Sequence, residues 1–203
     1  MIVKSKYKVA KRLGAEVFEK TQTQKFAATA ARRKQKMGRR PRSLSDFGRQ
    51  LLEKQKVRYT YGILEKQFSR YVKEVTKSHS QDPLSELFRK LEMRVDNVVF
   101  RLGLAPTRRQ ARQMVSHGHI TVGDKKMTIP SHHVRVGEKV AVKEGSREKS
   151  LFTLQADRIK EYNPPKWVKF DAKKLSGEVT QLPVYTTVDN HFDLAQVLEY
   201  YSR

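Results

Sequence analysis

The spacing of apolar residues predicts three helices between residues 45 and 92. Ser45 is a candidate N-cap for the first helix, and Gly62 marks the break before the second. In the second helix, the apolar residues at 64, 68, 71, 72 and 75 fall on one face. Pro83 opens a third, shorter amphipathic helix. Packing against a common core is the simplest role of these faces, so this segment is predicted to be a helical body.

The apolar pattern changes from helical to alternating between residues 93 and 145. Val95 begins a stripe of helical spacing, and Thr107 forms a capping box with Gln110 at the start of a second short helix. From Ile120 onward, apolar and polar residues alternate, as in strands that pack one face on a core. Two helices followed by a small antiparallel sheet describe a compact α+β module.

The last segment, residues 146–203, has a mixed pattern. A helix is expected over residues 151–162, before an Asn-Pro-Pro stretch breaks it. Short strands are expected around residues 167–170 and 177–182, and a closing helix carries apolar residues at helical spacing from Leu194. The segment therefore contains elements of both types.

Core size suggests how these segments combine. Neither residues 45–92 nor residues 146–203 offer enough apolar side chains for a full core of their own. We predict an α+β fold with a mostly helical body, formed by residues 45–92 and completed by residues 146–203. The α+β module at residues 93–145 is inserted between them.

Charge indicates the class of partner. The 203 residues include 43 Lys plus Arg against 21 Asp plus Glu, which gives a formal net charge of +22. Such an excess is normally kept because a polyanion neutralises it, and nucleic acid is the commonest polyanion. No run of about 18 apolar residues is present to span a bilayer, so a membrane partner is not expected.

More than half of the positive excess lies in residues 1–44, where few side chains can be buried. We predict that this segment is a basic extended arm that phosphates order; a solvated disordered tail is the alternative. Its clustered basic side chains are candidate RNA contacts, namely Arg32, Arg33, Lys34, Lys36, Arg39, Arg40 and Arg42.

Several kinds of chemistry are not expected. The chain has no cysteine, which excludes disulfides, Cys-based zinc sites and thiol nucleophiles. The start of the chain has no apolar core for a secretion signal, so a cytoplasmic setting is expected. There is no phosphate-binding glycine loop and no GxSxG motif, so we expect neither an enzyme nor a cofactor. A metal site is also not expected, although four histidines lie close in sequence, His117, His119, His132 and His133.

Basic residues of the module form the main candidate site. Arg108 and Arg112 lie one helical turn apart and are predicted to share an exposed face, with Arg109 beside them near the helix N-terminus. Guanidinium groups grip phosphate bidentately, and the unpaired backbone N–H groups of a helix start add donors. Arg94, Arg101, Lys125 and Lys126 could extend this surface. For any single arginine, a solvated charged face is the alternative.

Four stretches of sequence resemble one known family. RVDNVVFRLGLAPTRRQARQMVSHGHITVGDKKMTIPS, at residues 94–131, resembles the RNA-binding module first described in the small-ribosomal-subunit protein S-four. SDFGRQLLEKQKVRYTYGILEKQFSRY, at residues 45–71, resembles the helical body of the same family. YNPPKWVKFDAKKLSGEVTQLP and the closing VLEYYSR resemble its C-terminal segment. The resemblance covers about residues 45–203.

The resemblance implies a structural RNA-binding protein of the bacterial-type small ribosomal subunit, cytoplasmic and ribosome-bound. Such a protein binds the 5′ domain of small-subunit ribosomal RNA early in assembly, at a five-helix junction. It also lies beside a neighbouring small-subunit ribosomal protein near the path by which messenger RNA enters, an interface that influences decoding accuracy. The implied basic contacts are Arg94, Arg101, Arg108, Arg109, Arg112, His117, His119, Lys125 and Lys126 in the module, and Lys54, Lys56, Arg58 and Arg70 in the body.

Two departures from the family pattern matter. Many members carry an N-terminal cysteine cluster that binds zinc, whereas this chain is a cysteine-free form. Gly123 and Asp124 stand where the family often has Asn-Gly in the hairpin turn. Two alternatives remain: an RNA-modifying enzyme that carries the same module, and a DNA-binding regulator that uses residues 94–116 as a helix-turn-helix.

Overall fold

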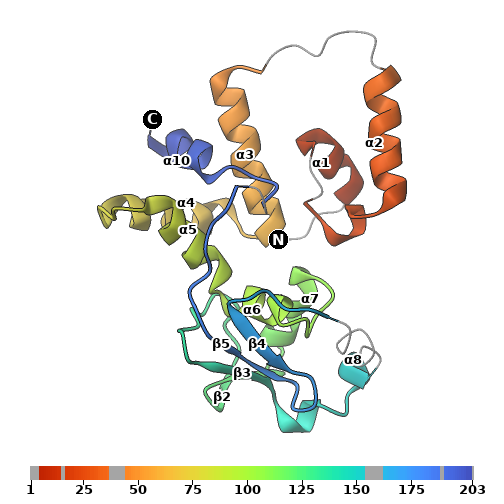
Figure 1. Ribbon diagram of the computed structural model, residues 1–203, viewed down its shortest axis with the longest axis vertical. Helices are drawn as coiled ribbons and strands as arrows, with labels where there is room; N and C mark the ends of the chain where they lie inside the picture. Colours follow the sequence, from red (N-terminus) through yellow and green to blue (C-terminus); the bar gives the residue numbers. More distant parts are fainter. Residues whose placement is uncertain (1–4, 15–16, 37–43, 154–161, 188–189, 203) are drawn as a thin grey trace. The chain divides into compact units, whose positions relative to one another are not determined.

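A computed structural model describes residues 5–14, 17–36, 44–153, 162–187 and 190–202 (Figure 1). These residues form an α+β fold with one five-stranded antiparallel sheet, which confirms the predicted class. The chain divides into two compact units. The first unit consists of residues 1–87 and 185–203, and the second of residues 88–184. Among the described residues, no helix is long and apolar enough to cross a membrane.

The first unit is helical. Its elements are α1 (Lys6–Leu13), the 3-10 helix η1 (Glu19–Thr21), α2 (Gln24–Lys36), α3 (Asp46–Tyr61), α4 (Glu65–Lys77), the first half of α5 (Pro83–Glu92) and α10 (Leu194–Ser202). The predicted boundaries of α3 are confirmed. The hydroxyl of Ser45 accepts a hydrogen bond from the backbone N–H of Gly48 at 3.2 Å, and Gly62 ends the helix with φ +62°. The closing helix α10 packs on α3.

The N-terminal segment differs from the predicted extended arm. A small apolar cluster joins α1, η1 and α2, and its buried members are Ala10, Leu13, Val17, Phe18 and Phe26. Leu52 and Tyr59 of α3 pack against this cluster. The local sequence has too few apolar residues for a core of its own, but the surface of α3 completes one. The segment is therefore folded onto the helical body where the structure describes it.

The second unit contains the module. Its elements are α6 (Val95–Arg101), α7 (Arg108–Ser116), β1 (Ile120–Val122), β2 (Lys125–Met127), β3 (Lys139–Val142), the 3-10 helix η2 (Glu144–Ser146), α8 (Ser150–Thr153), β4 (Val168–Asp171) and β5 (Ser176–Val179). The strand order is β2-β1-β3-β5-β4. Residues 154–161, the rest of the helix predicted after Leu151, lie outside the described residues.

The module does not end at residue 145 as predicted. β5 pairs with β3, so that Val140 lies opposite Gly177, and the sheet continues into β4. Gly177 permits this arrangement, because a Cβ atom there would lie 2.3 Å from Cδ2 of Leu102 and 2.7 Å from the carbonyl oxygen of Lys169. Of the predicted C-terminal half of the body, only residues 185–203 belong to the first unit.

The two faces of the sheet differ in character. Ile120, Val122, Val140 and Val142 are buried in the core of the unit, with Val98 and Met114 of the helices. Side chains at the alternate positions of these strands must point to the opposite face. The hairpin between β1 and β2 turns at Gly123 and Asp124, both with positive φ (+53° and +65°), as type I′ turns require. Asp124 thus adopts the left-handed conformation that the more usual Asn-Gly pair would supply.

Candidate nucleic-acid interface

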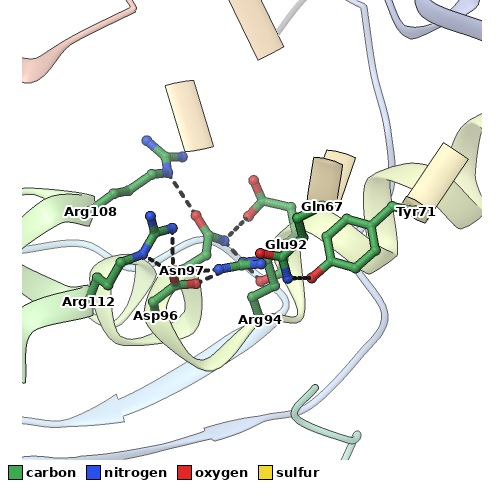
Figure 2. A network of polar contacts seen from close by, with 8 residues as sticks. All are labelled: Gln67, Tyr71, Glu92, Arg94, Asp96, Asn97, Arg108 and Arg112. Carbon is green, nitrogen blue, oxygen red and sulfur yellow. Dashed lines mark hydrogen bonds and ion pairs between the residues drawn. The ribbon is translucent and has the colours of Figure 1, made fainter. Parts of the chain in front are cut away.

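A buried acid, Asp96, holds two arginines at the junction of α6 and α7 (Figure 2). Arg94 donates to both carboxylate oxygens, with Nε to Oδ1 at 3.0 Å and Nη2 to Oδ2 at 2.8 Å. Arg112 of α7 reaches the same Oδ2 atom from Nη2 at 2.7 Å. Arg94 and Asp96 are each 3% exposed, so this pair is interior. The contact ties the start of α6 to α7.

A second buried acid, Glu92, extends the network. Its carboxylate accepts two hydrogen bonds from Arg101, each at 2.8 Å, and one from Nδ2 of Asn97 at 2.9 Å. The side-chain oxygen of Asn97 accepts from Nε of Arg108 at 2.8 Å (Figure 2). The guanidinium of Arg108 also lies over the ring of Phe100, 4.4 Å from its centroid. Two carboxylates and one amide thus engage four arginines.

The prediction that Arg108 and Arg112 lie on the exposed face of α7, opposite Ala111 and Val115, is wrong. Both arginines turn toward α6 and are half-buried. At about 100° per residue, positions 111, 115, 108 and 112 follow one another within an arc of about 100° on the helical wheel. Helical geometry therefore requires the buried residues and these two arginines to share a side.

The exposed face of α7 carries Arg109, Gln113 and His117, which are spaced by four residues. Together with Thr107 and His119 they line a shallow depression of about 270 Å³. Within the part of the chain that the structure describes, Arg109 forms no ion pair. Thr107 caps the helix by accepting from the N–H of Gln110 at 3.1 Å, as its capping-box position predicts. Gln113 is not among the predicted contacts, although its spacing of four residues from Arg109 places it on the same helix face.

The surroundings of His119 disfavour its protonated form. Its Nδ1 lies 3.0 Å from the hydroxyl of Ser146. Burial lowers the pKa of His119 below its usual value near 6.5, and the positive charge of Lys149 acts in the same direction. A neutral imidazole can still exchange hydrogen bonds with a ligand. In the described residues, no group of three His, Asp or Glu side chains is placed to hold a metal ion.

The predicted contacts of the helical body are mostly engaged in ion pairs. Lys54 is 5% exposed and reaches Glu65 at 2.8 Å, and Arg58 reaches the same carboxylate at 2.9 Å. Lys56 pairs with Glu53 at 2.6 Å. These cations join α3 to α4 or lie along α3 itself, so much of their charge is neutralised within the protein. Arg70 differs, because it is exposed and its carboxylate partner on α4 lies at 3.7 Å.

The remaining predicted contacts are at the surface or outside the described side chains. Lys125 and Lys126 are exposed on β2, and Arg32 is exposed on α2. Side chains that the structure does not describe are those of Arg33, Lys34 and Lys36, and residues Arg39, Arg40 and Arg42 are not described at all. Of the module's predicted contacts, Arg109, His117, Lys125 and Lys126 are therefore exposed.

Comparison with known proteins agrees with this arrangement. Residues 2–92 match the Ribosomal protein S4/S9 N-terminal domain, and residues 93–140 match the S4 domain. The first match includes the folded N-terminal segment, which the sequence resemblance had reached only loosely. The second begins at the junction where α5 meets α6 and ends within β3.

Whole-length relatives point to the same family. The small ribosomal subunit protein uS4 of Roseiflexus sp. (strain RS-1) is 41% identical over 198 residues, which is 97% of this chain and 96% of the relative. The protein of the same name from Herpetosiphon aurantiacus is 46% identical over 169 residues, 81% of this chain and 78% of the relative. The chain therefore belongs to the uS4 family of ribosomal proteins, as a non-enzymatic structural component of the small subunit with an S4 RNA-binding domain.

Proposed function

We propose that this protein binds the 5′ domain of small-subunit ribosomal RNA early in ribosome assembly, and that the exposed face of α7 makes a central contact. The observation that carries the proposal is the contrast between Arg109 and its neighbours. Arg108 and Arg112 are engaged with α6, whereas Arg109 is exposed without a carboxylate partner in the described residues. An unpaired guanidinium at the first turn of a helix suits an RNA phosphate.

The rest of the α7 face complements this contact. Gln113 and His117 follow Arg109 at intervals of one helical turn, and both are exposed. An amide and an imidazole can bond to a ribose 2′-hydroxyl or to a base edge in a loop or junction. Phosphate contacts position the protein, and these side chains would add preference for a folded RNA.

A role beside a neighbouring small-subunit protein, with an influence on decoding accuracy, is part of the same proposal. It rests on membership of the family and on the sequence resemblance over residues 45–203. The helical body would supply that protein surface, since the module supplies the RNA surface.

Binding to a transcript of the 5′ domain tests the RNA contact. Arg109→Ala is expected to weaken binding by about 1.5 to 3 kcal/mol, the range for a hydrogen bond to a charged group. It should leave the thermal unfolding temperature unchanged. Arg135→Ala is the matched control, because Arg135 is another exposed arginine of the same unit.

Equal affinity of the wild type and Arg109→Ala would contradict the proposed contact. A comparison of the folded transcript with duplex DNA of equal length separates this function from the DNA-binding alternative. A ribosomal RNA-binding protein should prefer the transcript even at salt concentrations that weaken all binding.

A further inference from the structure

The face of the sheet that points away from the core has a floor of small side chains. Thr121 of β1 lies opposite Ala141 of β3, and Ala141 lies opposite Ser176 of β5. Thr121 and Ala141 alternate with the buried apolar residues of β1 and β3, so their side chains point to the other face. Ser176 is paired directly with Ala141, and residues paired in this way share a face of the sheet. None of these three side chains is larger than threonine, and Lys126 of β2 lies at the edge of the floor, opposite Thr121.

Basic residues surround this floor. A groove of about 630 Å³ is lined by five cations, Lys126, Lys139, Lys143, Arg147 and Lys174, and by two acids, Asp124 and Glu144. All five cations are exposed, and within the described ranges none of them forms an ion pair. This sets them apart from Arg101 of α6 and Arg112 of α7, whose charges are engaged by the buried acids Glu92 and Asp96. The groove thus presents a net positive charge.

We propose that this groove is a second RNA-binding surface, which takes a sugar–phosphate backbone independently of the α7 face. The proposal rests on the proposed RNA-binding function and adds a separate contact to it. The groove and the depression beside α7 share no lining residue, so one RNA segment need not serve both. Two such surfaces on one unit would let it hold two parts of a folded RNA together.

The chemistry of the groove favours RNA over an acidic protein segment. Specific protein contacts usually depend on large apolar or aromatic anchors that fill pockets. The apolar lining residues here are only Ala141 and Val142, which offer no such pocket. Flexible lysines act as point charges toward phosphates and do not need bidentate geometry. We therefore expect the groove to bind RNA by its backbone, with little reading of base sequence.

The test uses a full-length variant with three neutral substitutions, Lys139→Gln, Lys143→Gln and Arg147→Gln. The control removes three exposed lysines from α4, by Lys66→Gln, Lys73→Gln and Lys77→Gln. Binding to the 5′ domain transcript is measured across a range of salt concentrations, and each complex is mapped by hydroxyl-radical footprinting. Lys126→Gln with Lys174→Gln is a second groove variant, in case the triple variant does not fold.

The groove variant is expected to make the slope of log affinity against log salt less negative by about 2 to 3, since each lost phosphate contact contributes about 0.7 to 0.9. It should also lose protection of one RNA segment that Arg109→Ala and the α4 control both leave protected. A wild-type slope and footprint would overturn the inference, and so would a footprint change identical to that of Arg109→Ala. Loss of binding in Arg109→Ala alone would sustain the proposed function while the groove proposal falls.

Discussion

Arg94 and Asp96 form a two-point ion pair in the interior of the second unit, with each residue 3% exposed. The same carboxylate receives Arg112 from α7 at 2.7 Å. Burying charges is costly unless each one is paired and hydrogen-bonded, and here both carboxylate oxygens and two guanidinium groups meet that condition. Through its contact with Arg112, Asp96 therefore fixes how α7 packs on α6. This packing also decides where the exposed face of α7 lies.

Neutralising Asp96 should destabilise the second unit strongly. In Asp96→Asn, Arg94 would stay buried without a counter-charge, so we expect a loss of about 3 to 5 kcal/mol in the free energy of unfolding. Urea denaturation followed by circular dichroism measures this loss. The control is Asp124→Asn in the exposed hairpin turn, which should change the value by less than about 0.5 kcal/mol. A loss below about 1 kcal/mol in Asp96→Asn would mean that the pair is dispensable.

Adding a methyl group at Gly177 should disturb the packing of β5 against Leu102 at the end of α6. The new Cβ would lie 2.3 Å from a methyl carbon of Leu102 and 2.7 Å from a backbone oxygen, so the strand or α6 must shift. We expect Gly177→Ala to cost about 1 to 3 kcal/mol of stability, the usual range for overpacking. Gly145→Ala is the control, because no atom lies within 4 Å of its Cβ position. Equal thermal unfolding temperatures for the two variants would contradict this expectation.

Glu65 should be important for holding the C-terminal helix on the body. It accepts hydrogen bonds from Lys54 at 2.8 Å and from the hydroxyl of Tyr201 at 2.7 Å. Burial by itself would raise the pKa of Glu65, but these hydrogen bonds outweigh burial and lower it. Glu65→Gln would leave Lys54 buried without its counter-charge. We expect a loss of about 2 to 3 kcal/mol, below the range for fully buried pairs because the Glu65 side chain is 41% exposed.

The control for Glu65 is Glu74→Gln on the same helix. Glu74 faces Arg70 at 3.7 Å with both side chains exposed, and such pairs contribute about 0.5 kcal/mol or less. Limited proteolysis near the C-terminus should become faster in Glu65→Gln and stay at the wild-type rate in Glu74→Gln. If both variants behave alike, the hydrogen bond between Glu65 and Tyr201 is not needed to hold α10 on the body.

Two histidines should make the second unit less stable in mild acid. Burial lowers the pKa of His119 and of His133 below the usual value near 6.5, with smaller effects from nearby lysines. Between the folded and unfolded pKa values, the unfolded chain binds more protons than the folded one. Stability is therefore fully present above about pH 6.5 and declines as the pH falls toward the folded pKa values.

The measurement is the free energy of unfolding at several pH values between about 8 and 5. Replacing both histidines, by His119→Asn and His133→Asn, should flatten the profile in this interval. The matched control is His191→Asn, because His191 is exposed and belongs to the first unit. An unchanged slope in the double variant would show that other groups cause the acid sensitivity.

The sequence predicted those elements whose signals are local. The cap at Ser45, the glycine at position 62 and the capping box at Thr107 are each set by residues a few positions apart. The N-terminal segment was predicted to be extended because its own apolar residues are few. Its core is completed by Leu52 and Tyr59 of α3, a contact between distant parts of the chain that no local pattern reveals.

The same distinction applies to the candidate site. Charge and motif identified the module and some of its exposed basic residues, including Arg109, but they did not separate solvent-facing arginines from paired ones. The missing information was the position of Glu92 and Asp96, which become counter-charges only when α6 and α7 pack together. The cations at 139, 143, 147 and 174 went unselected because they converge only when β3 and β5 pair.

By itself, then, the sequence determined the α+β class, the helices of the body and the RNA-binding module. Its net charge also indicated that the partner is a polyanion. Periodicity, capping and net charge are properties of short segments or of composition, so they are present before folding. Only the tertiary structure decided that the module continues to residue 184, that α1 and α2 pack on α3, and which cations face solvent. These features depend on contacts between residues far apart in the chain, whose partners are brought together by burial and strand pairing.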